Sequence, residues 1–183
     1  ESRVQPILDA MRKEGDSALK AFTARFDGVE MDNLQVSEAE VQEAISQVAP
    51  ELKAAIQLAK ENIEAFHRQQ WEDFQPIETM PGVKCWRKSV PISKVGLYIP
   101  GGTAPLFSSI LMLAVPAMIA GCETLVLCSP PNKEGKLHPA MVYTAHLLGL
   151  KQIYKAGGAQ AIAAMAYGTE TIPQCYKIFG PGN

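Results

Sequence analysis

Four short turns rich in glycine and proline carry the residues of this chain whose types can bind a ligand. They are residues 98–102 (Tyr-Ile-Pro-Gly-Gly), 128–131 (Cys-Ser-Pro-Pro), 156–160 (Ala-Gly-Gly-Ala-Gln) and 179–183 (Phe-Gly-Pro-Gly-Asn), here called the first to fourth turns. Each follows a short apolar run typical of a strand. If those strands are parallel, all four turns lie along one edge of a sheet. Open α/β sheets bind their ligands at that edge.

The third turn has the residue types of an anion site. Gly157 and Gly158 begin a predicted helix, where free amides and the positive end of the helix dipole favour an anion. Tyr98 in the first turn can lay its ring against a planar base. Gln160 and Asn183 can hydrogen-bond a ribose or an amide. These residues predict a ligand edge that suits a phosphate-bearing cofactor.

Two features of the usual dinucleotide site are missing. The G-x-G-x-x-G fingerprint does not occur, and the second turn stands where an acid would contact the ribose. Glycines at strand–helix turns are also common for reasons of turn geometry alone. The residues by themselves therefore leave the ligand unnamed and a purely structural role open.

The cysteines and histidines form no pattern typical of a metal or catalytic site. The cysteines are Cys85, Cys122, Cys128 and Cys175, with no C-x-x-C pair. We expect small buried side chains in a reducing cytosol, with a catalytic thiol as the alternative. The histidines are His67, His138 and His146. None has an acid or a second histidine at ligand spacing, so structural or solvated roles are expected.

Composition and charge restrict the class of protein. The 183 residues, 47% hydrophobic and 20% charged, are typical of a soluble globular chain with one core or two partial domains. A net charge of −2 argues against a nucleic-acid or anionic-membrane partner. The most apolar segment, residues 106–122, is short for a membrane span and predicts a buried helix. The chain starts without Met inside an apparent helix, so we expect further residues upstream.

The first half of the chain is predicted to be helical. Apolar residues at helical spacing indicate helices ended by Gly15 and Gly28. A capping box of Ser37 and Glu40 begins the next helix, and Pro50 begins another. Residues 71–81 are predicted to be a connection, interrupted by two prolines, and residues 83–90 a strand.

From residue 94 onward, strands alternate with helices. Strands are predicted over residues 95–99, 124–127, 152–155 and 176–179, and helices over 106–120, 139–148 and 159–167. This order predicts right-handed βαβ units and a parallel sheet. The fold class is therefore α/β. Residues 94–183 form a Rossmann-like domain, and residues 1–93 the helix-rich part of an incomplete first domain.

The same turns carry a resemblance to the histidinol dehydrogenase family. Matching stretches in the second half are residues 95–102, 104–108, 111–114, 119–122, 126–131, 157–164 and 177–183. In the first half they are residues 15–19, 26–27 and 61–67. The resemblance covers nearly the whole chain and rests on long motifs. It is to the N-terminal and NAD-binding portion of that family.

The resemblance implies a cytoplasmic, homodimeric, zinc-dependent enzyme of histidine biosynthesis. Such an enzyme oxidises L-histidinol to L-histidine through L-histidinal, using two NAD. Tyr98, Gln160 and Asn183 fall on the family's NAD-contacting positions, and Phe107 and Ser108 beside its active site. The family's zinc ligands and catalytic Glu-His pair lie beyond Asn183. We therefore expect no catalytic and no metal-ligating residue in this chain, and no activity from the chain alone.

Three alternatives stay open at this point. A zinc- and NAD-dependent dehydrogenase of another polar alcohol would share this part of the chain. An aldehyde dehydrogenase with a thiol nucleophile would need an activated Cys122 or Cys128. A non-catalytic binding fragment is the third alternative.

Overall fold

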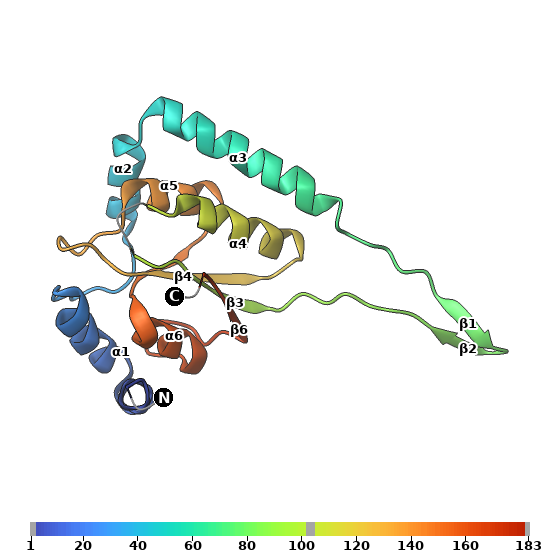
Figure 1. Cartoon of the computed structure of the whole chain (residues 1–183), viewed down its shortest axis with the longest axis horizontal. Coiled ribbons are helices and arrows are strands. Elements are labelled where there is room, and N and C mark those ends of the chain that lie inside the picture. The colour runs from blue at the N-terminus through green and yellow to red at the C-terminus, as the bar shows by residue number, and fades with distance from the viewer. Residues whose placement is uncertain (1–2, 102–104, 182–183) are drawn as a thin grey trace.

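A computed structural model describes residues 3–101 and 105–181 (Figure 1). Its helices are α1 (Gln5–Asp27), α2 (Glu38–Gln47), α3 (Pro50–Arg68), α4 (Phe107–Ile119), α5 (Pro139–Leu147) and α6 (Gly158–Tyr167). Its strands are β1 (Ile77–Met80), β2 (Val83–Cys85), β3 (Lys94–Tyr98), β4 (Thr124–Ser129), β5 (Gln152–Lys155) and β6 (Lys177–Phe179). Within the described ranges, no helix is both long and apolar enough to cross a membrane.

The predicted parallel sheet is confirmed. Four strands lie in the order β5-β4-β3-β6, and every neighbouring pair is parallel. The predicted strand and helix ranges from residue 94 onward agree with the observed elements to within two residues. The largest difference is that β4 continues to Ser129, so the second turn starts with two strand residues. The α/β fold class is therefore correct.

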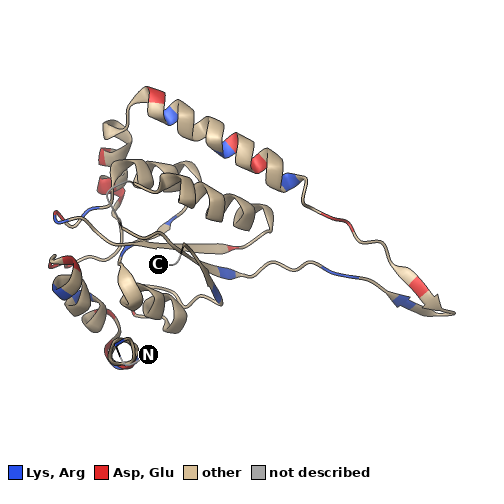
Figure 2. Cartoon of the chain, viewed as in Figure 1, with Lys and Arg blue, Asp and Glu red and all other residues tan. Residues whose placement is uncertain are grey.

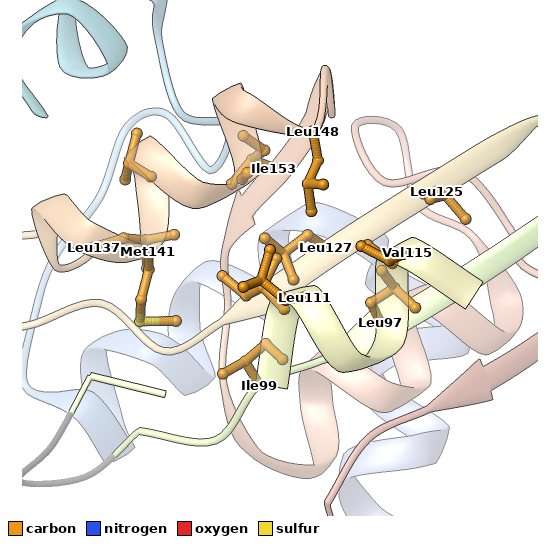
Figure 3. Packing of buried hydrophobic residues seen from close by; sticks show 14 of the residues in the cluster. Leu97, Ile99, Leu111, Val115, Leu125, Leu127, Leu137, Met141, Leu148 and Ile153 are labelled. Carbon is orange, nitrogen blue, oxygen red and sulfur yellow. The ribbon is translucent and has the colours of Figure 1, made fainter. Parts of the chain in front are cut away.

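Helices cover both faces of the sheet, which is why its strands are continuously apolar. Along β4, Leu125 and Leu127 belong to a core cluster with α4 and α5, while Val126 and Cys128 belong to a second cluster with α1 and α6. Figure 3 shows part of the first cluster, with Leu127 beside Leu111. Helices α2 and α3 add residues to that cluster from outside (Figure 1). The buried sheet thus fixes where each strand ends.

The predicted helix signals of the first half are present. Gly15 has φ 51° and kinks α1, which continues beyond it rather than ending there as predicted. Gly28 ends α1 in the left-handed conformation. The Ser37 side chain accepts from the Glu40 amide at 3.2 Å, and the Glu40 carboxylate accepts from the Ser37 amide at 2.8 Å. Pro50 begins α3.

The segment between α3 and β3 differs from the prediction. Residues 71–81, predicted to be a connection, contain β1, and the strand predicted over residues 83–90 is limited to β2. The two strands form an antiparallel hairpin joined at Gly82, which has φ 80°. Apart from half-buried Phe74, every residue from 71 to 90 is exposed, and the segment extends away from the sheet as an arm (Figure 1). In β1 and β2, strand pairing rather than burial orders the chain.

Charged residues lie along α1, α2, α3 and the arm, and the four-stranded sheet contains three, Lys94, Lys155 and Lys177 (Figure 2). Lys94 and Lys177 are exposed, whereas Lys155 at the end of β5 is only 6% exposed. Its Nζ donates to Glu40 Oε1 at 2.9 Å, so the capping residue of α2 also forms an ion pair directly before the third turn. This pair ties the first half of the chain to the sheet.

The stability of the chain should depend on pH through Glu40. Burial raises its pKa, but hydrogen bonds from the Ser37 amide and from Lys155 lower it and prevail. A carboxyl whose pKa is lowered in the folded state stabilises that state above its unfolded pKa, which is 4.5. This stabilisation is lost as the pH falls through the lower folded value. We expect Glu40→Gln to cost about 1.5–3 kcal/mol at pH 7.

In melts followed by circular dichroism, the melting temperature should therefore fall less between pH 7 and pH 3 for Glu40→Gln than for the unaltered chain. Glu38→Gln is the matched control, because Glu38 lies in the first helical turn of α2 as Glu40 does, but is exposed. An equal fall for Glu40→Gln and the unaltered chain would contradict this role of Glu40.

Candidate ligand edge

The structure brings the described parts of all four turns to one edge of the sheet. Strands β3, β4, β5 and β6 are parallel, so residues 98–101, 128–131, 156–160 and 179–181 lie at their carboxyl ends. Tyr98 and Gln160 are both at this edge. Asn183, the third predicted site residue, lies outside the described residues. The edge has the position at which open α/β sheets bind ligands.

Pro130 of the second turn packs between the first and third turns. A Cβ placed on Gly101 would lie 2.7 Å from Pro130 Cγ. A Cβ on Gly157 would lie 2.4 Å from Pro130 Cβ and 3.0 Å from its Cα. Only glycine lets the three turns approach this closely. The sequence placed Pro130 in the second turn but did not predict this packing, because nothing local shows that Pro130 faces two other turns.

Tyr98 joins the first turn to the third and fourth. Its hydroxyl accepts a hydrogen bond from the Gly158 amide at 3.0 Å. A Cβ on Gly180 would lie 2.4 Å from the carbonyl oxygen of Tyr98. The sequence suggested that the Tyr98 ring lies against a planar base. The structure gives its hydroxyl a bond to the backbone of the third turn.

Gln160 is folded beneath the third turn. It is 2% exposed, and its Oε1 lies 2.7 Å from where a Cβ on Gly158 would stand. Gly158 has φ 63°, a conformation that side chains rarely adopt. Gly158 therefore lies between the two described site residues: the Tyr98 hydroxyl holds its amide, and the Gln160 amide group packs against its Cα.

The chemistry available at this edge is that of binding. Gly157 is the N-cap of α6 and has no side chain. The amides in the first helical turn of α6 therefore depend on other groups for hydrogen-bond acceptors. The Tyr98 hydroxyl accepts from one amide and keeps its own proton to donate. In residues 3–101 and 105–181, no group of three or more His, Cys, Asp or Glu side chains can hold a metal.

The buried cysteines are poor candidates for a thiol nucleophile. Cys128 is fully buried, and burial raises its pKa far above the usual range. Burial also raises the pKa of Cys175, to about 11. The reactive species is the thiolate, which both environments disfavour. Cys122 is half-buried. Cys85 lies on the arm and is exposed, which differs from the buried side chain expected from the sequence.

Two of the three histidines have hydrogen-bond partners within the chain, and the third, His146, is exposed. His138 Nδ1 accepts from the Ala140 amide at 3.2 Å and caps α5, and His67 Nδ1 lies 2.7 Å from Gln70 Oε1. A hollow of about 340 Å³ includes His67 in its lining, together with arm residues and the C-terminal end of α4. That hollow contains no residue of the four turns. The candidate edge therefore lies outside this hollow.

Fold and edge together define a class of protein. A parallel sheet covered by helices on both faces, with glycine turns at its carboxyl edge, is the architecture of open α/β proteins, which bind their ligands at that edge. The family model of histidinol dehydrogenase matches residues 1–183. The chain therefore belongs to the histidinol dehydrogenase family.

Known relatives agree with this assignment. The chain is 58% identical over 180 residues to the histidinol dehydrogenase of Bacteroides fragilis and 52% identical over 180 residues to that of Xylella fastidiosa, in each case over 98% of this chain. The crystal structure of histidinol dehydrogenase from Elizabethkingia anophelis superposes with a TM-score of 0.97 at 50% identity, over the whole of this chain. The chain spans 42% of the length of each of these proteins.

The packing of Pro130 predicts which substitutions at the edge can be rescued. Gly101→Ala should destabilise the chain by about 1–3 kcal/mol, because the new methyl group meets Pro130 Cγ. Pro130→Ala removes that atom, so the double variant should recover most of the loss. Gly157→Ala meets Cβ and Cα of residue 130, which alanine keeps, so Pro130→Ala should not rescue it. Melts followed by circular dichroism measure all five variants. Equal rescue at both glycines would disprove this geometry.

Alkylation of the native chain tests the thiol alternative. Iodoacetamide should modify Cys85 readily. The modification rate of Cys128 should be lower by a factor of about a hundred or more, because Cys128 is buried and its thiolate is disfavoured. Peptide mass spectrometry measures both rates, and the chain unfolded in urea, where the rates should converge, is the control. Rapid modification of native Cys128 would restore the thiol alternative.

Proposed function

We propose that this chain is the NAD-binding portion of a cytoplasmic histidinol dehydrogenase. The reaction is the oxidation of L-histidinol to L-histidine through L-histidinal, with the reduction of two NAD. Family membership over the whole chain carries this proposal, together with the position of Tyr98 and Gln160 at one glycine-rich edge. We further propose a homodimer, with residues 94–183 as the NAD-binding domain and residues 1–93 as part of a first domain.

The residues at the edge fit NAD. The amides in the opening residues of α6, of which that of Gly158 donates to Tyr98, suit a phosphate, and the Tyr98 ring suits contact with a planar base. Gln160, which is 2% exposed, lies beneath these residues and packs against Gly158. Asn183 completes the set that the family resemblance assigns. When bound, NAD supplies the hydride acceptor. The part of this chain in the reaction is to bind and orient the cofactor.

Zinc does not fit the described residues in the same way. They contain no cluster of three or more possible ligands. A catalytic zinc usually needs three protein ligands. From the family resemblance we propose that the zinc ligands and the base lie outside these 183 residues, and we derive no step of the reaction from them.

Activity assays of two chains test the proposal. The complete chain that the gene encodes, supplied with zinc and NAD, should form two NADH for each L-histidinol. The 183-residue chain should form none, because the family resemblance assigns the zinc ligands and the catalytic Glu-His pair to positions beyond Asn183. NADH absorbance measures both.

Other outcomes of the assay would contradict the proposal. NADH formation by the complete chain only with another polar alcohol would favour the related dehydrogenase. Zinc-dependent NADH formation by the 183-residue chain would show that its own residues complete a catalytic site. Failure of the complete chain to bind NAD in a calorimetric titration would favour a non-catalytic role.

A further inference from the structure

Tyr98 contacts or pairs with all of the other three turns. In the register of β3 and β4, its Cα is paired with that of Cys128, the first residue of the second turn. Its hydroxyl bonds to the Gly158 amide of the third turn, and its carbonyl oxygen packs against Gly180 of the fourth. A single residue thus connects the whole described edge.

The hydrogen bond of the Tyr98 hydroxyl fixes Gly158, the residue of the third turn against which Gln160 packs. Gly158 is in the left-handed region and is the first residue of α6, so its amide has no partner within the helix. The Gln160 Oε1 lies close to the Cα of Gly158. Loss of the Tyr98 hydroxyl therefore frees the amide of the residue against which Gln160 packs.

We propose that Tyr98 is a positioning residue, whose hydroxyl holds Gly158, and through it Gln160, in the arrangement that binds the cofactor. This inference rests on the proposed function, in which the edge binds NAD. It differs from a stacking role, since stacking needs only the aromatic ring. The two roles separate in Tyr98→Phe, which keeps the ring and removes only the hydroxyl.

Kinetics of the complete chain measure the effect on the cofactor. Tyr98→Phe should raise the KM for NAD about three- to tenfold, which is the effect of losing one hydrogen bond. The KM for L-histidinol should stay unchanged. Tyr176→Phe is the matched control, because Tyr176 is 71% exposed and precedes β6 at the opposite end of the sheet. A general loss of folding would lower the amount of active enzyme and hence kcat, without this selective rise in KM.

Amide exchange measures the bond itself. In hydrogen-exchange NMR of the complete chain, the Gly158 amide should exchange at least about threefold faster in Tyr98→Phe than in Tyr176→Phe. An unchanged KM for NAD in Tyr98→Phe would overturn the inference and leave the proposed function standing. Absence of NAD binding by the unaltered complete chain would overturn both.

Discussion

Close approach of backbones at the carboxyl edge of the sheet is the constraint on which the other features of the candidate site depend. Gly101 and Gly157 lie against Pro130, and Gly180 lies against the Tyr98 carbonyl, at distances that no Cβ tolerates. These contacts set the spacing between turns that come from four different strands. The start of α6, Tyr98 and Gln160 are adjacent only because this spacing is so small. Glycine acts here as a packing residue, and the same packing leaves backbone amides near a ligand.

Much of the fold could be predicted because its signals are local or periodic. The alternation of strands and helices after residue 94 follows from apolar periodicity, and the parallel sheet follows from their order. Ser37 and Glu40 are three residues apart, so their capping box is visible in the sequence. Strand β2 lies within the predicted strand over residues 83–90, but β1 was missed because its residues are exposed and because Pro76 and Pro81 flank it as breakers would.

The contacts that give the candidate edge its chemistry could not be predicted in the same way. Tyr98 and Gly158 are 60 residues apart, and Glu40 and Lys155 are 115 apart. Sequence shows that a tyrosine ends one strand and a glycine begins one helix, but the bond between them depends on strand order and register. The sequence therefore predicted that Tyr98 and Gln160 lie at the described edge, but not that both contact Gly158.

The arm has a consequence for optical studies of this protein. The chain has two tryptophans, Trp71 and Trp86, and both lie on the arm with about three-fifths of their surface in solvent, at 61% and 62%. No indole belongs to either cluster around the sheet. Intrinsic tryptophan emission therefore reports the surroundings of the arm, and Trp71 also reports the hollow that the arm shares with the C-terminal end of α4. A change in that emission signals something approaching or leaving the arm or this hollow, while a ligand can bind at the four turns without contacting either indole.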